Sequence, residues 1–301
     1  MNNGTIAHLP ELIALQGLVR NKKHGARSKA AQTGHRSTRL RGRGMDFADV
    51  RNYQAGDEIR HMEWRSTART GRPHIKLYQE ERERPVVLLV DFNPSMYFGT
   101  HDVFKSVLAA RLAALLAWIA SAEGDRVGGF LFSATQHDEC IPKNRQQGVL
   151  PLLAKLSHYT SSLQQTQGIA ARPLNDVLLR LKRVLKPGSV LILISDFYTL
   201  DDTSERLLRR IKKHNDLIAY HVADLLELTA PKLGLYPITD GTKTSFLDLR
   251  KQAAATAYGN TLKARQDAIE NIFNRLCSPS VTTETDWATL AHQSFPRSSH
   301  A

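Results

Sequence analysis

Two strongly apolar runs in this sequence each end in an aspartate. Residues 85–90 read PVVLLV before Asp91, and residues 189–195 read SVLILIS before Asp196. Short runs without charged residues are typical of strands buried on both faces, as in a parallel sheet that helices cover. The carboxyl ends of parallel strands meet at one edge of such a sheet, where ligands of open α/β folds bind. We therefore expect Asp91 and Asp196 to lie together at that edge.

Beyond residue 84 the chain alternates between the apolar spacing of helices and that of strands. This order predicts an α/β fold with a mainly parallel, doubly wound sheet that carries helices on both faces. The expected helices are 104–119, 149–156, 174–185, 205–213 and 262–276, and the further strands are 126–132 and 216–222.

Four regions are expected along the chain. Residues 1–43 form a basic amino-terminal arm with one short helix, and residues 44–84 form a segment that packs on the core. The α/β domain takes residues 85–224. Residues 225–301 hold a hairpin around Asp240-Gly241, followed by a carboxyl-terminal helix and a tail.

The net charge of +12 is concentrated near the amino terminus. Residues 1–44 contain nine Lys or Arg and one acidic residue, a net of +8. The stretch from Arg20 to Arg43 is poor in large apolar residues, which is typical of a mobile segment. It has no aromatic residues for base stacking and no recognisable DNA-binding fold beside it. We interpret it as a solvated basic arm, with nucleic-acid binding through the arm as an alternative.

Cysteine usage and hydropathy bear on the compartment. Cys140 and Cys277 are too few for a disulfide framework and indicate a reducing environment. The first residues lack the charged start and long apolar run of a secretory signal. The longest apolar stretch, 107–122, contains Arg111 and is shorter than the roughly 20 residues that a membrane span needs. We expect a cytoplasmic protein without a membrane span.

The loop that opens at Asp91 reads Asp91-Phe92-Asn93-Pro94-Ser95. Oxygen donors at alternate positions of a turn can converge on a hard cation such as Mg²⁺ or Mn²⁺. With Asp196, the loop resembles the metal-ion-dependent adhesion site of von Willebrand factor A domains. In that site an Asp-x-Ser-x-Ser loop, a Thr from a second loop and a later Asp hold a divalent ion. The resemblance implies metal ligands at Asp91, Asn93, Ser95 and Asp196.

Two positions depart from that pattern. Asn93 stands in place of the first Ser, although its amide oxygen can still coordinate. The Thr position falls by register near Arg172, whereas the candidates for this fifth ligand, Thr166 and Thr160, lie earlier in the chain. An Arg at this place would repel a cation and could itself pair with the acids. A metal site and a metal-free turn capped by Asp91 both stay open.

A denser signature precedes the first apolar strand and runs from Gly44 to Gly71. Its distinctive residues are Phe47, Arg51, Tyr53, Gly56, Asp57, Arg60, Trp64, Ala68 and Arg69. This series closely resembles the domain of unknown function 58 family, and the later Ser-Asp-Phe at 195–197 extends the likeness. The resemblance implies a bacterial von Willebrand factor A-like protein that acts beside a MoxR-type AAA+ ATPase and other von Willebrand factor A-type proteins.

The signature has two physical interpretations. Arg51, Arg60 and Arg69 alternate with acids such as Asp57, and Trp64 offers an apolar anchor. The segment can therefore be a charge-paired clasp whose indole is buried against the sheet. Alternatively, the arginines form an exposed cluster that binds an acidic partner, since a guanidinium fork suits carboxylates. We favour the clasp, because paired arginine networks are often structural.

Common enzyme signatures are missing from the sequence. There is no Gly-x-x-x-x-Gly-Lys phosphate loop, no Gly-x-Ser-x-Gly elbow and no His-Glu-x-x-His helix. The sequence therefore predicts a protein-binding adaptor or chaperone-like partner of the ATPase, and not an enzyme. A Mg²⁺-dependent phosphoester hydrolase that uses Asp91 and Asp196 is the enzymatic alternative, although no general base or phosphate clamp is evident.

Overall fold

A computed structural model of the chain describes residues 4–19, 45–54, 56–80, 83–162, 169–239, 243–273 and 280–282. The chain divides into two compact units. One unit comprises Met1–Ala26 and Arg84–Ala301, and the other comprises Arg27–Glu83. We call the second one the hairpin unit and describe each unit by itself.

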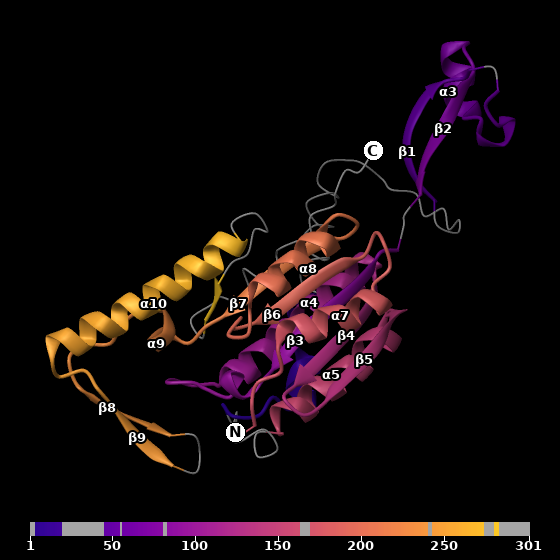
Figure 1. Cartoon of the computed structure of the whole chain (residues 1–301). Coiled ribbons are helices and arrows are strands. Elements are labelled where there is room, and N and C mark those ends of the chain that lie inside the picture. Colours follow the sequence, from indigo (N-terminus) through magenta and orange to yellow (C-terminus); the bar gives the residue numbers. More distant parts are fainter. Residues whose placement is uncertain are drawn as a thin grey trace. The chain divides into compact units, whose positions relative to one another are not determined.

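A six-stranded sheet forms the centre of the larger unit (Figure 1). Its strand order is β10-β7-β6-β3-β4-β5, and all neighbouring pairs are parallel except β4 and β5. The predicted doubly wound α/β fold is therefore confirmed. The strands are β3 (Pro85–Phe92), β4 (Arg126–Ser133), β5 (His137–Asn144), β6 (Val190–Ser195), β7 (Asp216–Val222) and β10 (Ser280–Val281).

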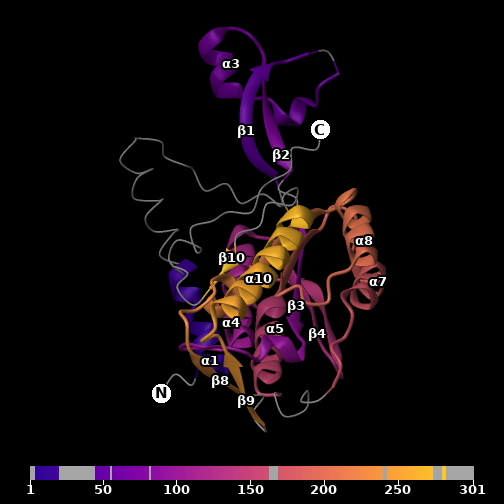
Figure 2. The same cartoon turned by 60° about the vertical axis from the view of Figure 1, so that its left-hand side comes forward.

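Helices cover both faces of this sheet, as Figure 2 shows from a second side. One face is covered by α1 (Leu9–Ala14), α4 (Lys105–Glu123) and α5 (Gln146–Thr160), and the other by α7 (Leu174–Val184), α8 (Asp202–Lys212) and the end of α10 (Gln252–Phe273). Side chains of β3 alternate between the two cores, because successive residues of a strand point to opposite faces. The uninterrupted apolar run of this strand follows from that double burial.

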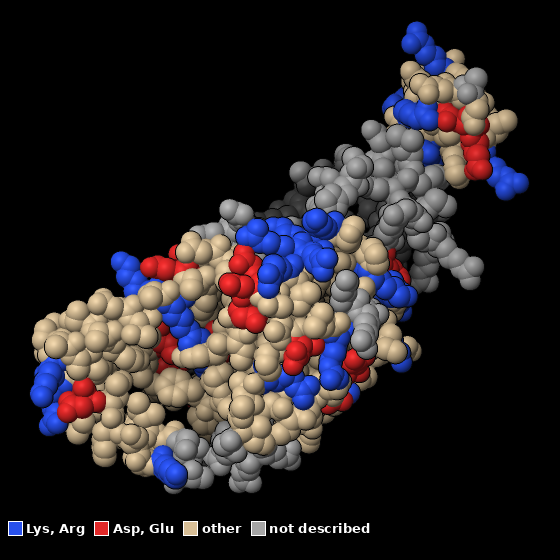
Figure 3. Space-filling view, viewed as in Figure 1, with Lys and Arg blue, Asp and Glu red and all other residues tan. Residues whose placement is uncertain are grey.

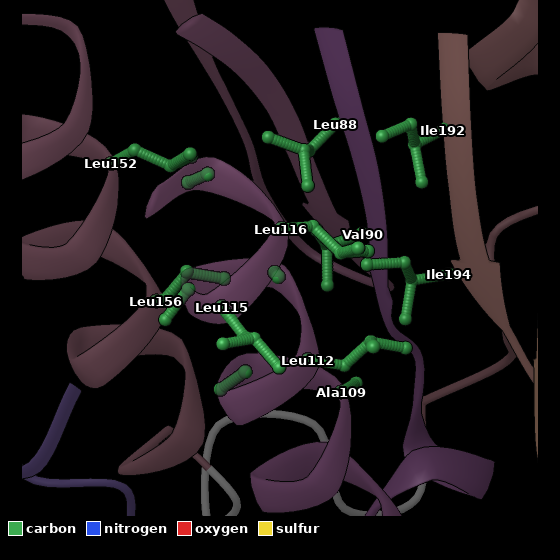
Figure 4. Packing of buried hydrophobic residues seen from close by; sticks show 14 of the residues in the cluster. Leu88, Val90, Ala109, Leu112, Leu115, Leu116, Leu152, Leu156, Ile192 and Ile194 are labelled. Carbon is green, nitrogen blue, oxygen red and sulfur yellow. The ribbon is translucent and has the colours of Figure 1, made fainter. Parts of the chain in front are cut away.

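Helix α4 is the central helix of one core. Its leucines pack against the apolar side chains of β3 and β6, and Figure 4 shows Leu112, Leu115 and Leu116 beside Leu88 and Val90. The helix ends at Gly124, whose φ of 93° is the left-handed conformation that glycine adopts readily. Among the described residues α4 is the one helix long and apolar enough to span a membrane, but most of it is buried in the protein.

The amino-terminal residues correct one expectation. Ala7, Leu12 and Val19 are buried in the core, and the backbone N–H of Ala7 donates to Thr160 Oγ1 at 3.1 Å. The Trp118 indole N–H donates to the Leu12 carbonyl at 3.1 Å. The prediction that residues 1–43 form one separate arm is therefore wrong for residues 4–19, because their apolar side chains complete the core. The basic stretch 20–44 lies outside the described residues.

Two strands of the sheet were not expected from the sequence. Strand β5 is an antiparallel edge strand in which exposed residues alternate with partly buried ones. Because none of its residues is fully buried, most of its side chains can be polar. Strand β10 contains only two residues and pairs with β7 at the opposite edge. Neither strand carries the apolar run that revealed the central strands.

The hairpin unit contains an antiparallel pair, β1 (Met45–Asn52) and β2 (His74–Glu80). The connection between them carries a 3₁₀ turn, η1 (Ile59–His61), and a short helix, α3 (Trp64–Thr70). The sequence did not predict this hairpin. Its strands are rich in polar residues, and the connection between them is long.

An ion pair and a hydrogen bond, both made by Asp57, stabilise the start of the connection between β1 and β2. Arg51 pairs with Asp57 at 2.7 Å, and Asp57 also accepts the backbone N–H of Gln54 at 2.9 Å. This part of the signature is the charge-paired element that we expected. Trp64, in contrast, is 66% exposed, so the apolar anchor predicted for it is not formed inside this unit.

After β7 the chain forms α9 (Leu225–Leu228), the hairpin β8 (Leu235–Thr239) with β9 (Thr244–Asp248), and then α10. The predicted carboxyl-terminal hairpin and helix are confirmed. Helix α10 begins ten residues before the predicted start at Leu262, because the alanine-rich stretch after Gln252 favours a helix without an apolar periodicity.

Candidate functional site

The candidate site lies at the carboxyl ends of β3 and β6. The chain continues from β3 to β4 on one side, while β6 pairs with β3 on the other, so this edge is a topological switch point. Asp91 is the next-to-last residue of β3 and Asp196 directly follows β6, and both carboxylates are buried. The Ser195 hydroxyl donates to Asp91 Oδ2 at 2.7 Å. The structure thus brings the two predicted acids to one place.

The loop after Asp91 is held by its own hydrogen bonds. The backbone N–H of Asn93 donates to Asp91 Oδ1 at 2.8 Å. The Asn93 carboxamide is bound on both sides by the backbone of Arg172, which donates to Oδ1 at 2.8 Å and accepts from Nδ2 at 3.1 Å. The Ser95 hydroxyl is buried and has no hydrogen-bond partner within the described part of the chain.

A buried lysine neutralises the acids. Lys105, in the first turn of α4, is 2% exposed, and its ammonium lies 2.8 Å from Asp196 Oδ2 and 2.7 Å from Glu227 Oε1. Burial by itself would lower the pKa of Lys105, but the attraction of the two carboxylates outweighs burial and raises the pKa above its ordinary value. Lys105 therefore carries a positive charge inside the protein.

Asp91 is the less stabilised acid of the cluster. Burial, followed by the charge of Asp196, raises the pKa of Asp91 to about 7, and the hydrogen bonds from Ser195 and Asn93 oppose that rise. Two carboxylates in one buried place repel each other unless a positive group or a proton intervenes. Lys105 forms its ion pair with Asp196 and not with Asp91, so the pKa of Asp91 stays raised to about 7.

Elements from the carboxyl-terminal region close the cluster. Glu227 comes from α9, which begins with a capping box formed with Asp224. Helix α10 contributes Arg265, whose guanidinium donates to the Asp196 carbonyl at 3.1 Å, and Gln266, which donates to the Leu228 carbonyl at 2.8 Å. The ion pair is therefore assembled from three distant parts of the sequence.

Tyr198 lies over this cluster. The Lys105 ammonium is 5.1 Å from the centre of the Tyr198 ring, and the Arg265 guanidinium also lies over the ring. The Tyr198 hydroxyl donates to Glu227 Oε1 at 3.2 Å. The side chain is nevertheless 51% exposed, so a fixed aromatic ring faces solvent at the switch point.

Three of the four predicted donors at the strand ends are already committed, and only the Ser95 hydroxyl is without a partner in the described part of the chain. Asp91 accepts hydrogen bonds at both carboxylate oxygens, and the Asn93 oxygen accepts from Arg172. Lys105 holds Asp196. In the described part of the chain, no group of three or more His, Cys, Asp or Glu is arranged to hold a metal ion. In this arrangement the residues do not fit Mg²⁺ or Mn²⁺, because an ammonium takes the position of the positive charge.

The remaining predicted ligands do not supply a fifth donor in the described structure. Thr166 lies outside the described residues. The Thr160 hydroxyl donates to the Ser157 carbonyl at 2.8 Å and accepts from the backbone of Ala7. The Arg172 guanidinium forms no ion pair with Asp91 or Asp196. It points instead to His137, with 3.4 Å between the guanidinium and a ring nitrogen. The alternative in which Arg172 supplies the cation is therefore wrong for its side chain.

Lys105 was missed by sequence reasoning. A weak signal existed, because Lys105 precedes Leu108 and Leu112 at helical spacing and so shares the face of α4 that is buried. A lysine on the apolar face of a helix requires a carboxylate partner. Glu227, one of its two partners, lies 122 positions away and could not be identified without the fold.

The parallel sheet, its two helical layers and the Asp-x-Asn-x-Ser loop at the switch point define a von Willebrand factor A-like α/β protein. The chain belongs to the family described as Protein of unknown function DUF58, which matches residues 49–268. The match includes the hairpin unit from Asp49 onward and most of the larger unit.

Individual relatives are distant. An uncharacterized protein of Mycobacterium bovis is 28% identical over 193 residues, which are 64% of this chain and 59% of that protein. The solved structure of the conserved hypothetical protein BatB from Bacteroides thetaiotaomicron is 14% identical, with a TM-score of 0.37, over 64% of this chain and 98% of that chain. A von Willebrand factor type A structure from Catenulispora acidiphila is 11% identical, with a TM-score of 0.35, over 72% of this chain and 42% of that chain.

Proposed function

We propose that this protein is a cytoplasmic, protein-binding adaptor that works with a MoxR-type AAA+ ATPase and other von Willebrand factor A-type proteins. Its contact face is the carboxyl edge of the six-stranded sheet. The observation that carries the proposal is Tyr198, an exposed aromatic ring fixed over a buried charge cluster at the switch point.

Tyr198 has the properties of an interface anchor. Tyrosine is enriched among the residues that dominate protein–protein binding energy. Its ring lies against Lys105 and Arg265, and its hydroxyl is bonded to Glu227, so little side-chain entropy remains to be lost on binding. The buried carboxylates of Asp91 and Asp196 accept backbone N–H groups and so hold the loops after β3 and β6 in one geometry. Because they are buried, a partner protein does not contact them.

This binding mode does not require a divalent ion. A metal-dependent contact, or a phosphoester hydrolase that uses Asp91 and Asp196, needs Lys105 to leave the Asp196 carboxylate. That exchange would leave the buried ammonium without one of its two acids, which is costly in a low-dielectric interior. Binding to the ATPase should therefore persist in a chelator.

The test is a binding assay between the full chain and the purified MoxR-type ATPase of the same organism, in a chelator and in Mg²⁺. Tyr198→Ala should weaken binding by at least tenfold, as expected for an anchor. Leu179→Ala is the matched control, because Leu179 is 52% exposed on α7 and so equally accessible. Absence of binding, or equal affinity of wild type and Tyr198→Ala, would overturn the proposal.

A further inference from the structure

One side of helix α3 is attached to the hairpin unit by hydrogen bonds, and the other side is exposed to solvent. Successive residues of a helix are 100° apart, so Trp64, Ala68, Arg65 and Arg69 follow one another around a continuous arc. All four are exposed, and Trp64 is 66% exposed. We call these four residues the outer face of α3.

The opposite side of α3 attaches the helix to β2. The Thr67 hydroxyl accepts the backbone N–H of His74 at 2.9 Å, and the Thr70 hydroxyl lies 3.3 Å from the His74 ring. Among the described residues, no hydrogen bond or ion pair joins the outer-face side chains to the rest of the hairpin unit, and α3 has no buried residue. Trp64 therefore contributes little to the packing of the unit that carries it.

Charge distinguishes this face from an ordinary solvated helix. Two acids of the unit are already committed, Asp57 to Arg51 and Glu63 to Lys76 at 2.8 Å. Arg65 lies close enough to Glu63 for its charge to help lower the pKa of the Glu63 carboxyl group. No ion pair is found for Arg69 in the part of the chain that the structure describes. Figure 3 shows blue basic side chains projecting from the hairpin unit around a smaller red area.

We propose that the outer face of α3 docks an acidic segment of a partner protein. The guanidinium groups of Arg65 and Arg69, one helical turn apart, bind carboxylates of that segment through paired hydrogen bonds. Ala68 leaves room beside the indole of Trp64, where an apolar side chain of the same segment packs. The inference rests on the proposed function in one respect, that the ligand of this chain is a protein.

A protein ligand fits this face better than a nucleic acid. Sites for single strands stack successive bases on several aromatic rings. The outer face offers one indole, flanked by two planar cations whose geometry matches carboxylates as well as phosphates. Nucleic-acid binding is therefore an outcome that the experiment must be able to reveal.

The experiment is a selection of random displayed peptides on the full chain, followed by affinity measurements on the selected peptides. We expect peptides in which Asp or Glu flank an apolar residue. Their affinity should fall at least tenfold in Trp64→Ala and in the double variant Arg65→Glu/Arg69→Glu, and it should weaken as salt rises.

The matched control is Arg206→Glu/Arg210→Glu on α8, which reverses the same number of exposed arginines at the same helical spacing. It should leave the affinities unchanged. Because Arg65→Glu stands near Glu63, the neutral variant Arg69→Gln is included, and it should reduce affinity in the same direction. Circular dichroism and melting of each variant confirm that it folds.

Three results would overturn the inference. Selected peptides that bind the α3 variants as tightly as wild type, or that lack acids, would show that the face does not read an acidic segment. A fluorescent single-stranded oligonucleotide whose binding is lost in Trp64→Ala would assign the face to nucleic acid. These readouts do not involve the ATPase, so failure of the Tyr198 assay leaves them separately interpretable.

Discussion

The ammonium of Lys105 lies 2.8 Å from the Asp196 carboxylate, at the strand end where the sequence predicted a divalent cation. A second acid, Glu227, binds the same ammonium at 2.7 Å. The protein thus supplies a positive charge from the first turn of its own helix α4. This relationship explains how two buried acids coexist at the switch point.

Removing this charge should destabilise the protein strongly. Lys105→Met leaves Asp196 and Glu227 without their counter-charge, and breaking a buried ion pair costs about 3–5 kcal/mol. The free energy of unfolding, measured by urea denaturation, should fall by that amount. Lys155→Ala is the control, because Lys155 and its partner Asp138 are each about one third exposed. A surface pair of this kind is worth about 1 kcal/mol or less, so equal losses in the two variants would contradict the buried role of Lys105.

Acid should weaken the fold through His221. Burial, opposed by the charge of Asp196, lowers the pKa of His221 to about 4. Between about pH 4 and the ordinary histidine value of about 6.5, the unfolded chain binds a proton that the folded chain does not. Stability from this group therefore rises as the pH rises through that window, by about 3 kcal/mol.

His221→Gln isolates that effect, since Asp91, with its pKa raised to about 7, changes stability with the opposite sign over much of the same range. Below its folded pKa, Asp91 keeps a proton that the unfolded chain loses, so its contribution declines as the pH rises from about 4 to 7. Melting curves of wild type and His221→Gln at several pH values should diverge between pH 6.5 and 4. Parallel curves would mean that His221 titrates normally.

Trp64→Ala should change stability very little. A buried tryptophan would cost about 3–5 kcal/mol on truncation, but Trp64 is 66% exposed, so we expect a change within about 0.5 kcal/mol. Trp118→Ala provides the comparison, since Trp118 is 3% exposed and donates to the Leu12 carbonyl. A large loss in Trp64→Ala would restore the clasp as the correct interpretation.

The amino-terminal helix should be part of the folded core. Leu12 is fully buried, and Leu12→Ala should cost about 2–5 kcal/mol in chemical denaturation. Leu18→Ala, at a position that is 37% exposed, should cost much less. If the two variants melt alike, residues 4–19 do not contribute to the core as the structure shows.

The central sheet could be predicted because strands that are buried on both faces appear in the sequence as uninterrupted apolar runs. Residues of β3 and β6 face helices on both sides, so nearly every position is apolar. The same reasoning placed Asp91 and Asp196 at one edge, since the strands are parallel. Edge strand β5 has no such apolar run, because polar residues are tolerated on its exposed side. Strands β1 and β2 are rich in polar residues as well.

The charge partner of the site could not be predicted, for a different reason. Lys105 is the first residue of an apolar helix, and its partner Glu227 belongs to a four-residue helix far along the chain. Only the tertiary fold brings these residues together. The acids carried a sequence pattern typical of a metal site, whereas Lys105 carried only the weak signal of its position on the apolar face of α4.

The most direct test of this account is the melting temperature of the wild-type chain as Mn²⁺ or Mg²⁺ is added, with chelator-treated protein as the reference. A ligand that binds the folded state raises the melting temperature by mass action. We expect no saturable rise for the wild type, because Lys105 holds the Asp196 carboxylate. A saturable rise that Asp91→Ala abolishes would show that the ion displaces Lys105, and it would contradict the account.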